Sequence, residues 1–370
     1  MLAGARWEEV PEIMAKLDNE SVLTALKTVM DPDLHRDLVS LNMIEDLSVV
    51  DDRVTFTLVL TTAACPLKDQ IEGDARSAVM KVPGVREVSI RTISRMRKPK
   101  DPTADRKALP GVASVIAIGS GKGGVGKSTV AANLAVALAA TGARVGLLDG
   151  DIYGPNLPRM LGVRRQPSTR DGKVLPLEAW GLKFMSMGLL VDEGEAVVWR
   201  GPMLHGAIKS FLHDVEWGDL DYLLVDLPPG TGDVQLSLIQ QTWVVGAVVV
   251  TTPSTVAIED AVKAVAMFAK LHVPVLGVIE NMSYFECPSC RTRHEIFNSA
   301  SAEERALAMG LPFLGAIPIH PDVREGGDSG KPVVLEKPGS PYARALVEIA
   351  GQLARRVSIQ AHAAPVPSAV

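Results

Sequence analysis

Residues 112–140, VASVIAIGSGKGGVGKSTVAANLAVALAA, decide the fold of this chain. The apolar, β-branched run at 112–118 predicts a buried strand, and the alanine-rich run at 127–140 predicts a helix. The segment between them matches the pattern G-x-x-x-x-G-K-[ST] at Gly121, Gly126, Lys127 and Ser128. Because this pattern forms a phosphate-binding loop when a strand precedes it and a helix follows, the stretch predicts a nucleotide site.

The residue types of this loop fit phosphate chemistry. Glycines let successive backbone N–H groups turn inward, and the following helix directs its positive end to the same point. Lys127 is expected to contact the β- and γ-phosphates of ATP, and the Ser128 hydroxyl to bind Mg²⁺. Lys122 is a second loop lysine with no carboxylate nearby, so a phosphate is its natural partner. The predicted nucleotide-binding residues here are Gly121, Lys122, Gly123, Gly124, Val125, Gly126, Lys127, Ser128 and Thr129.

Strands and helices alternate after this loop. The sequence predicts helices at 127–140 and 257–271, and apolar strands at 112–118, 144–148, 222–225, 247–252, 273–279 and 312–317. Such alternation is typical of an α/β, doubly wound, mostly parallel sheet. We therefore expect one P-loop domain over 111–357, followed by a disordered tail at 358–370, where periodicity ends.

The first 93 residues show a different pattern. They predict a helix at 18–30, a hairpin of strands 46–50 and 54–61, a second helix after Pro66 and a last strand at 85–93. These elements make a small α+β domain. Residues 94–110 hold six Lys or Arg, two Asp and three Pro, which is typical of a linker.

Composition excludes several classes of protein. The 370 residues carry 38 basic and 43 acidic side chains, a net charge of −5, so a strongly basic nucleic-acid binder is excluded. No apolar run approaches the ~18 residues of a membrane span, and no signal peptide is evident. Three cysteines are too few for a disulfide framework. We expect a cytoplasmic protein with reduced thiols, bound to neither nucleic acid nor membrane.

Two predicted strands end in acids. Asp149-Gly150-Asp151 follows 144–148, and Asp226 follows 222–225. Ligands of doubly wound sheets bind beyond the carboxyl ends of the strands. We assign Asp226 to a water bound to Mg²⁺ and Asp151 to orientation of the attacking water. With Lys122 and Lys127, these two acids form the predicted catalytic set.

Cys287 and Cys290 have C-x-x-C spacing, which suits one edge of a metal ion or cluster. A complete site needs four ligands, and two identical chains would supply four thiolates, so a [4Fe–4S] cluster on a two-fold axis fits the count. Other interpretations stay open: a zinc site completed by His294 and one more ligand, a redox pair, or an incidental pair. Cys65 is either a thiol of low pKa or a small buried residue.

Taken together, these motifs resemble the Mrp/ApbC family of iron–sulfur cluster carriers over residues 108–350. The residues that carry the resemblance are the phosphate loop 121–129, Asp149–Asn156, Trp199–Pro202, Asp226–Asp233, Glu280–Tyr284, Cys287–Cys290 and Ile317–Asp328. Residues 18–93 resemble a small iron–sulfur assembly domain through Asp31–Asp33 and Thr61–Asp69. Ala63 and Arg291 depart from the residues common in these families, Pro and Gly.

The resemblance implies a SIMIBI-type, MinD-like deviant Walker A P-loop fold and a homodimeric ATPase. Such a protein binds a [4Fe–4S] cluster through Cys287 and Cys290 and passes it from scaffolds to apo-proteins. Lys122 is implied to cross the dimer interface, Asn281 to contact the adenine, and the segment from Pro318 to wall the base. Hydrolysis is expected to be slow because no arginine finger is obvious, Arg200 being a candidate.

Three rival functions remain at this stage. A MinD/ParA-type positioning ATPase would need a C-terminal amphipathic membrane helix or a basic DNA-binding face. A nitrogenase-reductase-like electron donor would share the bridging cluster but transfer electrons. An ATPase regulator with structural zinc would hold zinc at the cysteines instead of iron and sulfide.

Overall fold

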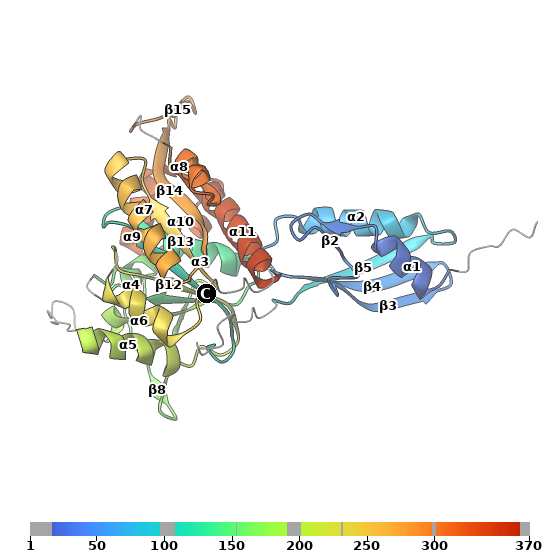
Figure 1. Ribbon diagram of the computed structural model, residues 1–370, viewed down its shortest axis with the longest axis horizontal. Helices are drawn as coiled ribbons and strands as arrows, with labels where there is room; N and C mark the ends of the chain where they lie inside the picture. Colours follow the sequence, from blue (N-terminus) through green and yellow to red (C-terminus); the bar gives the residue numbers. More distant parts are fainter. Residues whose placement is uncertain are drawn as a thin grey trace, which may run out of the picture. The chain divides into compact units, whose positions relative to one another are not determined.

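The computed structural model describes residues 17–96, 108–152, 154–190, 201–230, 232–297 and 301–362, without the side chains of Gly201, Pro202, Leu204 and Asp233. The chain divides into two compact units (Figure 1). The first is built from the residues up to Leu60 and from Leu67–Ser94, and the second from Thr61–Pro66 and the residues from Arg95 onward. Most of the predicted linker, residues 97–107, lies outside the described residues.

The first unit is a small α+β fold. Its three-stranded sheet has the order β3-β4-β5, in which β3 and β4 form an antiparallel hairpin and β5 runs parallel to β4. Asp18 caps the first helix through the backbone N–H of Ser21. The elements are α1 (Asn19–Leu26), β1 (Met30–Asp31), β2 (Arg36–Asp37), β3 (Ile44–Val50), β4 (Arg53–Leu60), α2 (Lys68–Met80) and β5 (Glu87–Ser94). The predicted helix–hairpin–helix–strand order is therefore confirmed.

The second unit is built on a nine-stranded sheet of order β10-β11-β7-β12-β6-β13-β14-β15, with β16 also paired to β14. Strands β11, β7, β12, β6, β13, β14 and β16 are parallel, and β10 and β15 are antiparallel additions. The strands are β6 (Val112–Gly119), β7 (Val145–Asp149), β10 (Leu177–Ala179), β11 (Leu182–Ser186), β12 (Leu220–Asp226), β13 (Gly246–Thr251), β14 (Val275–Glu286), β15 (Arg293–His294) and β16 (Phe313–Ile319). The predicted doubly wound, mostly parallel sheet is confirmed.

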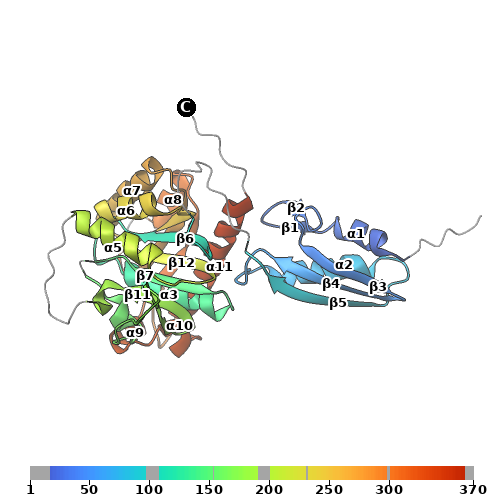
Figure 2. The ribbon, with the colours of Figure 1, turned by 90° about the horizontal axis from the view of Figure 1, so that it is seen from below.

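Helices cover both faces of this sheet and create two apolar cores (Figure 2). One core contains α3 (Lys127–Ala140), α10 (Val333–Glu336) and α11 (Pro341–His362), and the other contains α5 (Gly201–His213), α6 (Asp233–Gln241) and α7 (Thr255–Lys270). Shorter helices are α4 (Leu157–Met160), α8 (Ala302–Ala308) and α9 (Pro321–Ser329). Helix α3 is buried from Val130 to Leu138, which explains its lack of a polar face.

Four elements differ from the sequence expectation. Strand β14 does not end near 279 but continues to Glu286, because its later residues pair with β16 and β15. Strands β10 and β11 were missed because they are short and lack a long apolar run. Helix α11 runs past the expected boundary at 357 to His362, since Val357 and Ser358 are still buried. In the described part of the chain, no helix is long and apolar enough to cross a membrane.

Candidate nucleotide site and thiol pair

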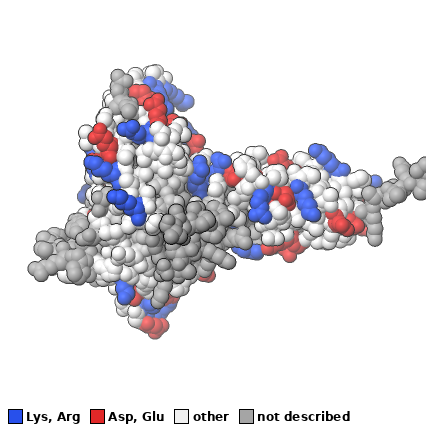
Figure 3. Space-filling view, viewed as in Figure 1, with Lys and Arg blue, Asp and Glu red and all other residues white. Residues whose placement is uncertain are grey.

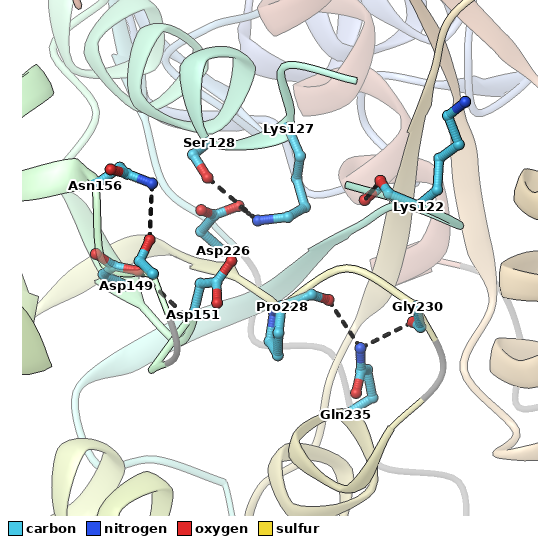
Figure 4. Close-up of polar contacts among 12 residues, drawn as sticks. Lys122, Lys127, Ser128, Asp149, Asp151, Asn156, Asp226, Pro228, Gly230 and Gln235 are labelled. Atoms are coloured by element: carbon cyan, nitrogen blue, oxygen red, sulfur yellow. Dashed lines mark hydrogen bonds and ion pairs between the residues drawn. The ribbon is translucent and has the colours of Figure 1, made fainter. Parts of the chain in front are cut away.

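The predicted acids meet the phosphate loop at one edge of the sheet. In the parallel pair β12–β7, Asp226 lies opposite Asp149, and in the pair β12–β6 it lies opposite Ile118, just before the loop. Parallel strands end at the same edge, so their last residues gather where helix α3 begins. Figure 4 shows Lys127, Ser128, Asp149, Asp151 and Asp226 grouped there.

Lys127 and Asp226 form a buried ion pair. Lys127 Nζ lies 2.6 Å from Asp226 Oδ1, and their side chains are 6% and 0% exposed. Burial raises the pKa of Asp226, and the ammonium group of Lys127 opposes that shift. The Ser128 hydroxyl lies 3.3 Å from Lys127 Nζ. An arriving phosphate would compete with Asp226 for this lysine.

The same carboxylate fits a magnesium site. Asp226 Oδ2 is buried and has no hydrogen-bond partner among the described residues. A buried acceptor of this kind calls for a donor or a cation. Mg²⁺ prefers oxygen ligands and keeps several of its waters. The Ser128 hydroxyl and a water held by Asp226 are therefore chemically suited to hold Mg²⁺.

The loop conformation requires its glycines. Gly124 and Gly126 have φ of +79° and +80°, the left-handed region that favours glycine. A Cβ on Gly126 would lie 2.2 Å from Asn281 Nδ2, and one on Gly121 would lie 2.1 Å from the backbone of Asp260. Gly121 and Gly126 are therefore required by the close packing of the loop against α7 and β14. The Lys122 side chain points away from Lys127 and Asp226 (Figure 4).

Asp149 is a site residue that the sequence analysis did not select. It is buried, accepts a hydrogen bond from Ser186 Oγ at 2.9 Å, and accepts another from the Asp151 backbone N–H at 3.2 Å. Burial, followed by the charge of Asp226, raises the pKa of Asp149 to about 8. The sequence signal was its place at the end of a strand beside the strand of Asp226. No local pattern could reveal Ser186, which lies on β11.

A second missed residue, Gln235, holds the loop after Asp226. Its Nε2 donates to the carbonyl oxygens of Pro228 and Gly230, both at 2.9 Å (Figure 4). The Gly230 N–H donates to Ser120 O at 2.9 Å. Asp151, Pro228 and Gln235 line a cavity of about 550 Å³. Asp151 thus faces a space large enough for water and a terminal phosphate. The loop beside this space can exchange the hydrogen bond from the Gly230 N–H to Ser120 O for one to a ligand.

A cavity of about 410 Å³ opens beside Gly126 and Thr129. Asn281 and Pro318, predicted to contact the base, both line it, together with residues of α4 and α9. Asn281 is buried, and its Nδ2 donates to Val125 O at 2.9 Å. The amide therefore joins the phosphate loop to this cavity. Its size and position suit a nucleoside whose phosphates enter the loop.

The thiols lie on the turn between β14 and β15. The Cys287 N–H donates to Thr292 O at 3.0 Å, and the Arg291 N–H donates to Cys287 O at 2.8 Å. The Cys290 thiol donates to Thr292 Oγ1 at 3.1 Å. Hydrogen bonding with the Thr292 side chain and backbone, and then with Cys287, lowers the pKa of Cys290. This favours the thiolate, the form that binds metals.

A zinc site at Cys287 and Cys290 would need further ligands, and none converges there among the described residues. Within the described ranges, no group of three or more His, Cys, Asp or Glu converges to hold a metal ion. His294 pairs across the hairpin with Phe285, and their rings lie 6.4 Å apart. None of the three cysteines forms a disulfide within the described structure, and Cys65 is half-buried. Arg200, the candidate arginine finger, lies outside the described residues.

Comparison with known families agrees with this geometry. Residues 111–354 match the ParA family model described as NUBPL iron-transfer P-loop NTPase, and residues 19–90 match the iron–sulfur cluster assembly protein model. The chain belongs to the iron–sulfur cluster carrier family. The resemblance found in its motifs is thereby confirmed, and its second unit is a P-loop NTPase domain.

Individual relatives support the assignment to this carrier family. An iron–sulfur cluster carrier protein of Deinococcus radiodurans is 53% identical over 344 residues, 92% of this chain and 96% of the relative. The iron–sulfur cluster transfer protein NUBPL of Mus musculus is 49% identical over 255 residues, 68% of this chain and 80% of the relative.

Solved structures agree with the fold. A nucleotide-binding protein of Archaeoglobus fulgidus in complex with ADP is 38% identical, with a TM-score of 0.55 over 65% of this chain and 94% of its own. MinD of Pyrococcus horikoshii with Mg-ADP is 28% identical, with a TM-score of 0.50 over 64% of this chain and 94% of its own. The MinD-like fold expected from the motifs is thus confirmed.

Proposed function

We propose that this chain binds a [4Fe–4S] cluster as cargo across a homodimer and uses ATP binding and slow hydrolysis to transfer it to apo-proteins. The observation that carries the proposal is the continuity of β14. One strand, Val275–Glu286, contains Asn281 in the nucleoside cavity and leads directly into Cys287. A change at the nucleotide can therefore reach the thiols along one continuous segment, whose register against β16 shifts between Asn281 and Phe285.

On the nucleotide side, each residue has a distinct task. The loop 121–129 binds the phosphates, and Lys127 leaves Asp226 for the β- and γ-phosphates. Ser128 and Asp226 would hold Mg²⁺, which neutralises phosphate charge when bound. Asp151 orients the water whose oxygen bonds to the γ-phosphorus as the bond to the β–γ bridging oxygen breaks. Lys122, directed away from its own site, reaches the nucleotide of the second protomer.

On the cargo side, one chain supplies two thiols. A [4Fe–4S] cluster takes about four cysteine ligands, so a pair of C-x-x-C turns completes the set. Cys290 is exposed and Cys287 half-exposed, which leaves the cluster open to an acceptor protein. The relatives named as cluster carrier and cluster transfer proteins support apo iron–sulfur proteins as acceptors and cluster scaffolds as donors.

A positioning ATPase is less well supported. Its membrane helix would be α11, but the apolar residues Leu346, Leu353 and Val357 of that helix are buried in the core of the second unit. Among the described side chains that Figure 3 colours by charge, basic and acidic groups are interspersed, and they form no large uniformly basic area on this face. That face therefore offers no support for DNA binding.

Anaerobic reconstitution with iron and sulfide tests the cargo. We expect about four irons and four sulfides per dimer in the wild type and in the control Cys65→Ala, and neither in Cys287→Ala with Cys290→Ala. Zinc without sulfide would replace this proposal with a zinc regulator. Iron retained by the double variant but lost from Cys65→Ala would move the site to Cys65.

A transfer assay tests the coupling. The loaded dimer is mixed with an apo [4Fe–4S] enzyme, and the recovered activity is followed with ATP, with a non-hydrolysable analogue and with neither. We expect nucleotide to change the transfer rate, and Lys127→Ala to abolish that change. Equal rates in all three conditions would refute the coupling. A cluster that cycles between redox states without leaving the dimer would indicate an electron donor.

A further inference from the structure

The nucleoside cavity contains a polar group that the proposed mechanism does not use. Tyr342 lies at the start of α11 and is 1% exposed. Its side chain lines the cavity of about 410 Å³ together with Asn281 and Pro318. The Tyr342 hydroxyl is buried and has no hydrogen-bond partner in the described part of the chain. A residue that lines the cavity therefore carries a buried hydroxyl group without a partner among the described residues.

Such a group needs an explanation, because a buried hydroxyl without a partner destabilises the folded state. Burial raises the pKa of Tyr342, and no hydrogen bond opposes the shift. A second tyrosine of the same unit provides a comparison. Tyr222 is equally buried, but its hydroxyl lies 2.6 Å from Thr62 Oγ1. The Tyr222 hydroxyl thus has a hydrogen-bond partner, whereas the Tyr342 hydroxyl beside the cavity has none among the described residues.

Three other polar side chains that line the cavity already have partners within the protein. Asn281 Nδ2 donates to Val125 O, and Arg324 donates to Asp328. His320 Nδ1 accepts from the Asp322 N–H at 3.2 Å. A ligand that contacts these groups must share or displace a protein partner. The Tyr342 hydroxyl has no described protein partner that a ligand would have to displace.

We propose that Tyr342 is a nucleoside-binding residue whose hydroxyl forms a hydrogen bond with the base or the ribose of the bound nucleotide. This rests on nucleotide binding in the cavity, as in the proposed function. The aromatic ring is fixed at the start of a long buried helix, so the hydroxyl is held in place before the ligand arrives. Its hydrogen bond exists only in the bound state, and the residue therefore contributes to affinity and to the choice of nucleoside.

The test is Tyr342→Phe, with Tyr222→Phe as the matched control. Each variant removes one buried hydroxyl. ADP affinity is measured by calorimetry and stability by urea unfolding without nucleotide. For Tyr342→Phe we expect roughly tenfold weaker ADP binding with equal or greater stability, since an unsatisfied group is removed from the empty state. For Tyr222→Phe we expect lower stability and unchanged ADP affinity, because a satisfied pair is broken far from the cavity.

Two analogues identify the contacted group. If the contact is with the ribose, wild type and Tyr342→Phe will bind 2′-deoxy-ADP equally. If it is with the adenine amino group, they will bind purine riboside diphosphate equally. A loss that persists with both analogues assigns the contact to a ring nitrogen or the 3′-hydroxyl.

Two results would overturn the inference in different ways. Equal ADP affinity of Tyr342→Phe and wild type would refute the role of Tyr342 and leave the proposed function intact. Failure of the wild type to bind ADP would refute both.

Discussion

The part of β14 beside the nucleoside cavity differs sharply from the thiol turn that follows this strand, although the chain between them is continuous. Near the nucleoside cavity, Glu280 accepts hydrogen bonds from Ser283 and from the Ala302 N–H, and Asn281 donates to Val125 O. The side chains of Glu280, Asn281 and Ser283 are buried. At the other end, Cys290 is exposed, and its contacts lie within its own turn. In Figure 1 this turn lies at the far end of β14, next to β15.

The nucleotide end and the thiol end differ in how much of each site is already formed within one folded chain. The nucleotide end is built from buried groups, two of which have partners far away in the chain, Val125 in the phosphate loop and Ala302 of α8, so its geometry is set by folding. The thiol end holds two ligands on a short hairpin and, for a four-ligand cluster, needs a second copy. Substitutions at the first end should change stability and binding together, and those at the second should change cargo binding alone.

Lys127→Ala should have the largest effect. It leaves the Asp226 carboxylate buried without its counter-ion, and we expect a loss of about 3–5 kcal/mol of unfolding free energy together with loss of ATP binding. Urea unfolding and ATP titration measure both. The control is Lys122→Ala, since Lys122 is not buried and should leave stability nearly unchanged. Recovery of stability in Lys127→Ala with Asp226→Ala would confirm the cause, and a stable single variant would contradict it.

The pH dependence of stability isolates Asp149. Its pKa is raised to about 8 when folded, against about 3.9 when unfolded, so between these values the folded state binds the extra proton. Stability from this group is therefore fully present below pH ~4 and is lost as the pH rises toward 8. Relative to Asp149→Asn, we expect the wild type to lose about 1 kcal/mol per pH unit between pH 5 and 7. Parallel pH profiles of the two proteins would show that Asp149 is already ionised.

Gly126→Ala tests the junction between the phosphate loop and β14. Both Gly126 and its control Gly124 have positive φ, so alanine at either position strains the backbone by about 1–2 kcal/mol. Only at Gly126 would the new Cβ strike Asn281, whereas at Gly124 no described atom lies within 4 Å. We expect Gly126→Ala to lose more stability than Gly124→Ala and to weaken ADP binding further. If the two variants weaken ADP binding equally, the position of the Asn281 side chain does not affect nucleotide binding.

Cys290→Ser should have the smallest effect on stability. The thiol is exposed and contacts only its own turn in the described structure, so the unfolding free energy should change by less than about 0.5 kcal/mol. Cluster binding should nevertheless be lost. Unfolding curves of the cluster-free proteins and iron analysis after reconstitution give the two values. A large loss of stability would mean that the hairpin is a structural part of the domain rather than a separate cargo site.

Much of the site was accessible from local sequence. The loop 121–129 carries its chemistry in adjacent residues, and Asp226 and Asp151 follow apolar strands that a parallel sheet must align at one edge. The resemblance to the carrier family predicted that Asn281 and Pro318 contact the base, and both residues line one cavity in the structure. Asp149 was overlooked because a strand-end acid is common, and its special state depends on burial beside Asp226.

The sequence by itself determined the α/β class, the phosphate loop, the thiol spacing and the family. Each of these depends on residues adjacent in the chain or on the regular spacing of apolar residues. Tertiary structure alone decided that Ser186 holds Asp149, that Gln235 holds the loop at Pro228, and that the Tyr342 hydroxyl lacks a partner among the described residues. The physical reason is that a buried hydrogen bond needs two groups at about 3 Å, and strand register and helix packing set that distance. Residues far apart in the chain acquire such partners only when the sheet and its two helical layers form.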